Sequence, residues 1–209
     1  MRFVSLISSG IDSPVATYVS SKKSTSLILI HADGKPYTDD REINNFISIA
    51  KSLKNQIKIE IRAFLIPHVK NLSIYQQKCD KKYTCVFCKR MLLRYAESIL
   101  LKNNAEAIIM GDSLGQVASQ TLYNIKVIDQ AIKTPILRPL IGLDKENIIK
   151  IAKKIGTFNI SILPKESCNA VPSKPSTKCK LINILNEEKK INIDKLVKYS
   201  TDNVKEVII

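Results

Sequence analysis

A loop of small and hydroxylated residues, SSGIDS at positions 8–13, directly follows the apolar run of residues 2–7. Pro14 then opens a helical pattern, and proline suits the first turn of a helix because its missing N–H would have no partner there. The amides of the loop and of the helix N-terminus therefore converge on one point, which favours an anion. Asp12 needs a nearby cation or hydrogen bond, because its carboxylate repels phosphate. The spacing indicates a phosphate-binding loop, although Ser/Gly turns of this kind are also common as purely structural elements.

A second polar segment, residues 111–121, follows another apolar run at residues 105–110. Its sequence, GDSLGQVASQT, combines two glycines and a carboxylate with several hydroxyl and amide side chains. This composition is typical of a ligand-binding loop at the end of a buried strand. The structural alternative is a capped loop, in which Asp112 or Ser113 accepts hydrogen bonds at the start of the next helix.

Five cysteines, at positions 79, 85, 88, 168 and 179, give an odd count that argues against a disulfide framework. Cys85 and Cys88 form a CxxC pair at the start of a basic helical segment. Two thiols at this spacing can bind a metal ion or cluster, form a redox pair, or pack as small core residues. We expect the neighbouring Lys89 and Arg90 to favour the thiolate form.

The chain is strongly basic, with 33 Lys and Arg against 19 Asp and Glu among 209 residues and a formal net charge of +14. Such an excess favours a polyanionic partner such as RNA or DNA, because each phosphate contact releases counterions and steers association. The alternative is a lysine-covered surface that keeps the protein soluble. No apolar stretch reaches the ~20 residues of a membrane span, and the first strand leaves no room for a signal peptide. We therefore expect a cytoplasmic protein that does not enter a membrane.

Strand-like and helix-like segments alternate along the chain, which predicts an α/β fold with a doubly wound, mostly parallel sheet. The expected strands are residues 2–7, 26–31, 57–64 and 105–110, and the expected helices are residues 14–22, 39–53, 86–102 and 145–155. Ligands of such sheets bind beyond the carboxyl ends of the strands, where both polar loops fall. We expect one domain over residues 1–180, with residues 181–209 as a weakly helical tail packed on it.

Several segments together resemble known proteins. The SSGIDS loop resembles the SGGxDS loop of the PP-loop ATP pyrophosphatases, with Ser9 where that family usually has glycine. GDSLGQVASQT resembles the GESLGQVASQT segment of the ThiI-type tRNA 4-thiouridine synthases. Residues 89–94 (KRMLLR), 138–145 (RPLIGLDK) and 155–161 (IGTFNIS) resemble further ThiI motifs, as does His31 followed by PYT at residues 36–38.

The resemblance implies a PP-loop ATP pyrophosphatase fold and an ATP-dependent tRNA sulfurtransferase. ATP would adenylate a uridine carbonyl oxygen and make it a good leaving group, and sulfur would then displace AMP to give 4-thiouridine. Asp12 would organise Mg²⁺ and pyrophosphate, and Lys145 would neutralise phosphate charge. The implied ATP-binding residues are Leu6, Ile7, Ser8, Ser9, Gly10, Ile11, Asp12, Ser13, His31, Ala32, Lys89, Gly111 and Gln120.

Cys168 falls where ThiI proteins place a catalytic cysteine. With the CxxC pair, the chain resembles the archaeal ThiI branch, in which three cysteines hold an iron–sulfur cluster. The resemblance therefore implies a [4Fe–4S] cluster on Cys85, Cys88 and Cys168, with one iron free to bind hydrosulfide. The alternative is structural zinc with a fourth ligand from Cys79 or Cys179, which we otherwise expect to be non-ligands.

The resemblance covers only the catalytic core of ThiI proteins, so no THUMP domain and no rhodanese domain is expected. The implied partners are tRNA and a sulfide or persulfide donor; a separate THUMP-like RNA-binding protein and a homodimer stay open. Two other functions also stay open: a PP-loop sulfurtransferase for another tRNA base or a small molecule, and a non-catalytic nucleotide-binding subunit with structural zinc.

Overall fold

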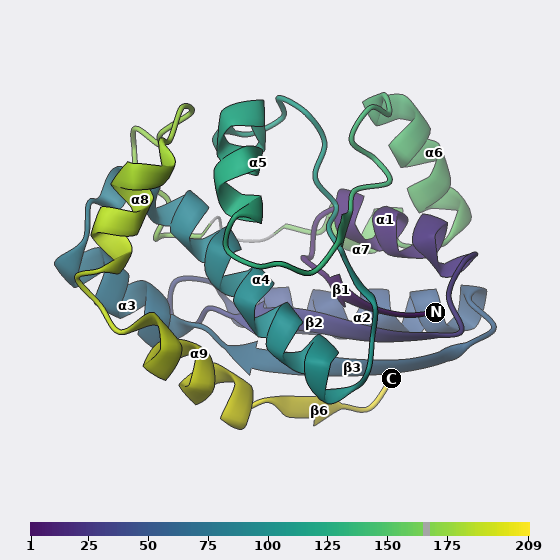
Figure 1. The fold of residues 1–209 in the computed structure, drawn as a ribbon. Helices are drawn as coiled ribbons and strands as arrows, with labels where there is room; N and C mark the ends of the chain where they lie inside the picture. Colours follow the sequence, from purple (N-terminus) through teal and green to yellow (C-terminus); the bar gives the residue numbers. More distant parts are fainter. Residues whose placement is uncertain (165–167) are drawn as a thin grey trace.

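The computed structural model describes residues 1–164 and 168–209, and in them six strands form one sheet in the order β5-β4-β1-β2-β3-β6 (Figure 1). Neighbouring strands are parallel, except that β6 pairs antiparallel with β3. The α/β fold with a mostly parallel sheet is therefore confirmed. The strands are β1 (Arg2–Leu6), β2 (Ser26–Asp33), β3 (Glu60–Pro67), β4 (Ala107–Ile109), β5 (Ile136–Leu137) and β6 (Lys205–Val207).

Helices cover both faces of the sheet, as a doubly wound fold requires. Alternate side chains of a strand point to opposite faces, so Val4 and Ile28 join one apolar core while Phe3 and Leu27 join the other. The layer over the second core contains α1 (Asp12–Ser21), α2 (Asp40–Gln56), α6 (Lys145–Lys154) and α7 (Phe158–Ser161). The layer over the first contains α3 (Val69–Lys78), α4 (Thr84–Lys102), α5 (Leu122–Asp129), α8 (Leu181–Glu188) and α9 (Ile193–Asp202).

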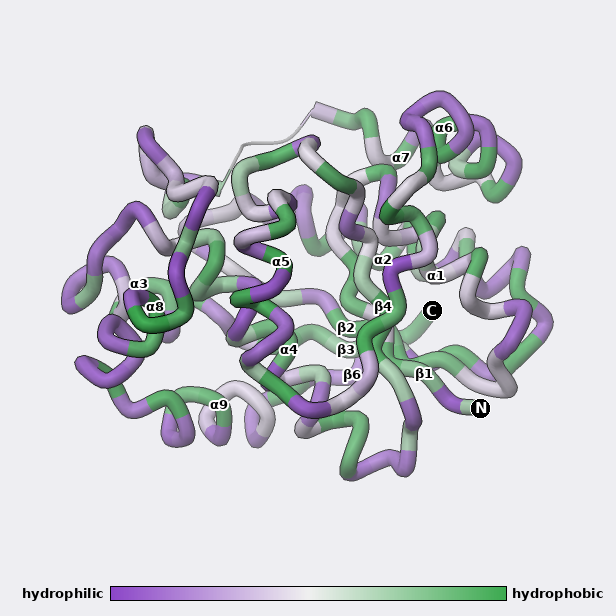
Figure 2. Tube along the Cα trace, turned by 45° about the horizontal axis from the view of Figure 1, so that its top comes forward, coloured by the Kyte–Doolittle hydropathy of each residue, from purple (hydrophilic) through white to green (hydrophobic). Residues whose placement is uncertain are grey.

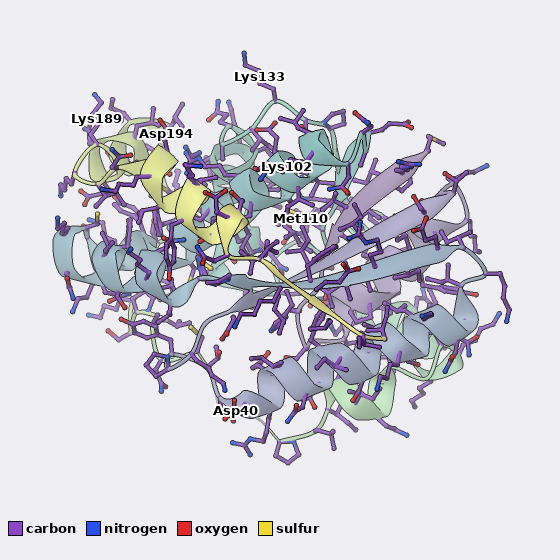
Figure 3. The ribbon with its side chains drawn as sticks, turned by 90° about the horizontal axis from the view of Figure 1, so that it is seen from below. Asp40, Lys102, Met110, Lys133, Lys189 and Asp194 are labelled. Atoms are coloured by element: carbon purple, nitrogen blue, oxygen red, sulfur yellow. The ribbon has the colours of Figure 1, made fainter. Side chains whose placement is uncertain are left out.

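The outer faces of these helices are polar. Figure 2 shows hydrophilic and hydrophobic residues alternating along α4 and α5, as expected where one side of a helix packs inward. Lysines such as Lys133 and Lys189 project away from the body of the molecule in Figure 3. Among the described residues, no helix combines the length and the apolar character that crossing a membrane requires.

The expected strands and helices all exist, with shifted ends. β3 begins later than expected because Ile57 ends α2, where its N–H donates to the carbonyl oxygen of Leu53 at 2.8 Å. The helices α3, α5 and α7 and the strand β5 were not predicted as elements, whereas the expected weakly helical tail forms α8 and α9 and also contributes β6. A bidentate ion pair between Arg62 of β3 and Glu206 of β6, at 2.8–2.9 Å, accompanies this added edge strand.

A buried ion cluster joins α4 to α8. Both carboxylate oxygens of Glu188 accept bonds from Arg90 at 2.8 and 3.0 Å and from Arg94 at 2.8 Å. The Arg90 side chain is only 1% exposed, and it also donates to the carbonyl oxygen of Val127 in α5. Burial alone would raise the pKa of Glu188, but the two guanidinium groups lower it below its ordinary value. Arg90 is therefore a structural residue, not part of a basic surface.

Glu188→Gln should lower the free energy of unfolding at neutral pH by about 3–5 kcal/mol, because it leaves two largely buried guanidinium groups without their counter-charge. Since the folded state depresses the pKa of Glu188, this stability exists above the ordinary glutamate pKa and is lost as the pH falls through the lower folded value. Urea unfolding of variant and wild type should therefore differ at neutral pH and converge in acid.

The matched control is Asp202→Asn, which removes the exposed Lys198–Asp202 pair of α9 and should leave the urea midpoint unchanged. Equal midpoints for Glu188→Gln and Asp202→Asn at neutral pH would contradict the structural role of the buried cluster.

Candidate active site

A cavity of about 320 Å³ lies at the carboxyl ends of β1, β2 and β4. It is lined by every residue that the sequence suggested for ATP binding except Ser9: Leu6, Ile7, Ser8, Gly10, Ile11, Asp12, Ser13, His31, Ala32, Lys89, Gly111 and Gln120. Ile30, Leu92, Met110 and Asp112 complete the lining. One mostly apolar pocket with a few converging polar groups is the usual form of a small-molecule site.

The loop of residues 8–13 is closed by its own hydroxyl groups. The Ser8 N–H donates to Ser13 Oγ at 2.8 Å, and the Gly10 N–H donates to Ser8 Oγ at 3.2 Å. The following helix, α1, has Ile11 at its N-cap, and no side chain caps it there. The start of α1 therefore has no side-chain acceptor at its N-cap, and Ile11, Asp12 and Ser13 line the cavity, which suits an anionic ligand.

Ser9, the departure from the SGGxDS pattern, points out of the cavity. Its side chain is buried, and its Oγ donates to Glu42 Oε2 of α2 at 2.5 Å. The hydroxyl therefore takes no space from a ligand in the cavity. A serine at this position attaches the loop to α2, and the cavity is lined by the other residues of the loop.

Gly111 brings the second polar loop into contact with the first. A Cβ atom at Gly111 would lie 2.5 Å from both the backbone N and the Cα of Ser13. Real Cβ atoms do not approach backbone so closely, so only glycine allows these two loops to meet here. This contact fixes the distance between the two walls of the cavity.

A buried carboxylate, Asp112, organises the cationic side of the cavity. It accepts from Lys89 Nζ at 2.6 Å and from Arg138 Nε at 2.9 Å, and Arg138 also binds Asp129. Burial raises the pKa of Asp112, but Lys89 and Arg138 lower it more, so the group stays ionised. Asp112 and Arg138 were missed as site residues, although a carboxylate directly after a buried strand was a usable signal.

Asp12 and Lys145 meet at the open side of the cavity. Lys145 Nζ lies 2.5 Å from Asp12 Oδ1 and 3.3 Å from Gln116 Oε1. The lysine thus supplies the cation that the carboxylate of the loop needs, and both groups remain partly exposed. Ser161 of α7 contacts the same loop, because its Oγ donates to the carbonyl oxygen of Gly10 at 3.2 Å.

His31 is a wall of the cavity held in a fixed orientation. Its ring stacks on Phe46 with 4.9 Å between centroids, and its Nδ1 lies 2.8 Å from the carbonyl oxygen of Ile7. A carbonyl oxygen can only accept, so Nδ1 carries the proton of this ring. The polar edge of His31 is therefore engaged with β1.

The three thiols of Cys85, Cys88 and Cys168 interact electrostatically with one another beside this cavity. Burial and the neighbouring thiols raise the pKa of Cys85, and they raise that of Cys88 to about 12, while Lys89 offsets this only in part. Lys89 thus favours the thiolates of Cys85 and Cys88 as expected, but burial outweighs its effect, and Arg90 binds Glu188 instead.

In the part of the chain that the structure describes, no three His, Cys, Asp or Glu side chains form a group that could hold a metal ion. Cys79 and Cys179 lie in another environment: Cys79 Sγ contacts the carbonyl oxygen of Glu187 at 3.4 Å, and Cys179 is buried in the apolar core. Neither is among the groups that perturb Cys85 or Cys88.

Residues 168–179 are attached at both ends by hydrogen bonds to segments that adjoin the cavity loops. The N–H of Asn169 donates to the carbonyl oxygen of Tyr37 at 2.9 Å. At the other end, buried Asn124 donates to Ser176 O and to Ala118 O, both at 2.7 Å, and accepts from the Cys179 N–H at 2.9 Å. Asn124 thereby joins the segment that carries Cys168 to the loop that ends at Gln120, a role the sequence did not reveal.

A strand–SSGIDS–helix loop at the carboxyl edge of a parallel sheet, with a pocket beneath it, defines the PP-loop ATP pyrophosphatase fold. The fold is similar to that of a crystal structure described as a 4-thiouridine synthetase–RNA complex with bound ATP. That match has a TM-score of 0.94 and 30% identity, and it covers 100% of this chain and 55% of the other. The NMN synthetase of Francisella tularensis shares the fold alone, with a TM-score of 0.57 and 15% identity over 96% of this chain and 83% of the other.

The family described as "Thiamine biosynthesis protein (ThiI)" matches residues 1–193, so the chain belongs to the ThiI family. A "Probable tRNA sulfurtransferase" of Thermoanaerobacter sp. (strain X514) is 39% identical over 98% of this chain and 53% of its own length. A protein of the same name from Methanosarcina mazei is 39% identical over 94% of this chain and 49% of its own length. The chain thus spans about half the length of these curated relatives.

Gly111→Ala should destabilise the protein by about 1–3 kcal/mol and weaken ATP binding at least tenfold, because the new methyl group must displace the backbone at Ser13. Gly142→Ala is the matched control on a nearby loop, since a Cβ there meets nothing within 4 Å. Calorimetric ATP titration and thermal unfolding measure both effects. If the two alanine variants bind ATP equally well, the two loops do not depend on their close contact.

Proposed function

We propose that this chain is the catalytic part of an ATP-dependent tRNA sulfurtransferase that converts a uridine to 4-thiouridine in the cytoplasm. One observation carries the proposal: Cys88 and Lys89 are consecutive on α4, and they belong to the thiol group and to the nucleotide cavity respectively. A site for activating an oxygen and a site for delivering sulfur therefore share one helical turn. Family membership and the two tRNA sulfurtransferase relatives support the same reaction.

In the proposed reaction, the amides of residues 8–13 and of the first turn of α1 bind the phosphates of ATP. The uridine oxygen attacks the α-phosphorus, and the bond to the β-phosphate bridging oxygen breaks to release pyrophosphate. Lys145 and Lys89 stabilise the charge that develops on the leaving group. Asp12 would hold Mg²⁺, which proteins typically bind through one or two carboxylates together with substrate phosphates.

The donor set of the second step suits an iron–sulfur cluster better than zinc. Zinc draws four thiolates to about 2.3 Å from one ion, which requires sulfurs nearly in contact. The thiol of Cys168 acts on those of Cys85 and Cys88, but in the described residues the three form no such compact group, and Cys79 and Cys179 lie apart from them. Cys85, Cys88 and Cys168 would hold a [4Fe–4S] cluster, which would supply an iron site for a sulfide ligand. Their protons would leave when it binds.

The proposed acceptor is tRNA. The net charge of +14 favours a polyanion, and the similar structure with 30% identity is described as an RNA complex with bound ATP. A sulfide or persulfide donor would be the second partner. The case for a non-catalytic nucleotide-binding subunit rested on Ser9 and on the expected absence of an RNA-binding domain, and the orientation of Ser9 toward Glu42 removes the first of these two arguments.

Cys85→Ser, Cys88→Ser and Cys168→Ser should each abolish thiolation of tRNA while leaving pyrophosphate release from ATP, because they remove sulfur delivery and not activation. Lys145→Ala should lower both rates by about 10²–10³-fold, the usual effect of removing one stabilising charge. Nucleoside mass spectrometry and a pyrophosphate assay measure the two steps separately. Cys79→Ser, whose thiol lies elsewhere, is the control and should act like the wild type.

The proposal would be overturned if Cys168→Ser thiolated tRNA at the wild-type rate. Pyrophosphate release with a small acceptor, and none with tRNA, would instead support the alternative acceptor class.

A further inference from the structure

A buried chain of polar side chains ends at Cys88, and the reaction proposed above does not use it. His68 Nε2 lies 3.2 Å from Cys88 Sγ, and His68 Nδ1 lies 3.0 Å from Tyr95 Oη. Asn71 Nδ2 donates to Tyr95 Oη and, at 2.8 Å, to Ser200 Oγ. His68 is 2% exposed, and Tyr95, Asn71 and Ser200 are 0% exposed. These four side chains are therefore shielded from bulk water.

The direction of each hydrogen bond in this series of side chains follows from Ser200, its last member. Ser200 Oγ lies 2.6 Å from the carbonyl oxygen of Pro67, which can only accept, so the single hydroxyl proton of Ser200 points there. Ser200 must then accept from Asn71, which fixes the amide with its nitrogen toward Ser200 and Tyr95. The Tyr95 oxygen therefore accepts from Asn71.

The remaining proton of Tyr95 has His68 Nδ1 as its acceptor. A buried hydroxyl proton without an acceptor is unfavourable, so the favoured arrangement directs Tyr95 O–H to Nδ1. With Nδ1 accepting, the one proton of the neutral ring is on Nε2. That nitrogen faces the sulfur of Cys88.

We propose that His68, held as the Nε2–H tautomer by Tyr95, donates a hydrogen bond to the sulfur of Cys88 and is a positioning residue for that thiol. Its effect on an iron–sulfur cluster rests on the proposed function, whereas the tautomer itself does not. A donor at the sulfur orients the side chain and favours its deprotonated, ligand-competent form.

The scaffold of this chain comes from four elements. Pro67 ends β3, His68 precedes α3 and donates its N–H to Asp33 O at 2.8 Å, and Tyr95 lies two turns after Cys88 on α4. Ser200 comes from α9, so the C-terminal part of the chain takes part in holding the thiol. Because each member is fixed by its own element, the donor is in place before any ligand binds.

Ring-nitrogen NMR of the full chain without iron tests the tautomer directly. The chain has two histidines, and the structure gives them opposite tautomers: Nδ1–H for His31 and Nε2–H for His68. One ¹⁵N-resolved spectrum therefore contains the test and its control, and His68→Gln assigns the signals. Tyr95→Phe should release the Nε2–H preference of His68 and leave His31 unchanged. An Nδ1–H tautomer for His68 in the wild type would overturn the proposal.

The consequence for the cluster is tested by iron retention. After anaerobic reconstitution, the affinity of His68→Phe for iron, measured by competition with a chelator, should be about 10–100-fold weaker than that of the wild type. This is the typical cost of losing a hydrogen-bond partner of a metal ligand. His68→Gln, which can still donate from its amide, should keep most of the affinity. Equal retention in His68→Phe and wild type would overturn the positioning role. If the wild type retained no iron, the proposed cluster would be contradicted, but the tautomer of His68 would still be tested by the NMR spectrum.

Discussion

The first two turns of α4 carry both the CxxC thiols and a lysine of the cavity, and the proposed function depends on this constraint. Cys85 and Cys88 are three residues apart and share one face of the helix, while Lys89 is next along the chain and lines the nucleotide cavity. A small rotation or shift of α4 would therefore move the thiols and the cation together. Buried ion pairs on different sides of α4 hold this helix in place, and each pair contains a charged group that would be unfavourable to bury alone.

Two buried ion clusters fix α4 along its length. Near its start, Asp112 accepts from Lys89 and from Arg138, so the lysine is held at the cavity before any nucleotide arrives. Beginning at the very next residue, Glu188 neutralises Arg90 and Arg94 and attaches α8. Breaking such pairs is expensive because a buried charge is left behind, which makes the placement of the helix well defined. Catalysis by fixed charges needs this kind of preorganisation.

The sequence predicted those features whose signal is local. The loop at residues 8–13, the loop beginning at Gly111 and the CxxC pair each carry their meaning in adjacent residues, and the alternation of strands and helices predicted the sheet that brings them together. The sequence could not show pairings between distant segments. Arg90 looked like part of a basic face until Glu188, 98 residues away, proved to be its partner. The contact of His68 with Cys88 likewise exists only because the end of β3 places His68 beside α4.

The central claim is that nucleotide and thiols occupy one site, and protection of a thiol by nucleotide tests it most directly. Cys85 and Cys79 are both partly exposed, but only Cys85 lies beside the cavity residue Lys89. The rate of alkylation of each thiol, measured by mass spectrometry with and without a non-hydrolysable ATP analogue, separates them. We expect slower alkylation of Cys85 with the analogue and an unchanged rate for Cys79. Equal rates for Cys85 with and without saturating analogue would contradict this claim.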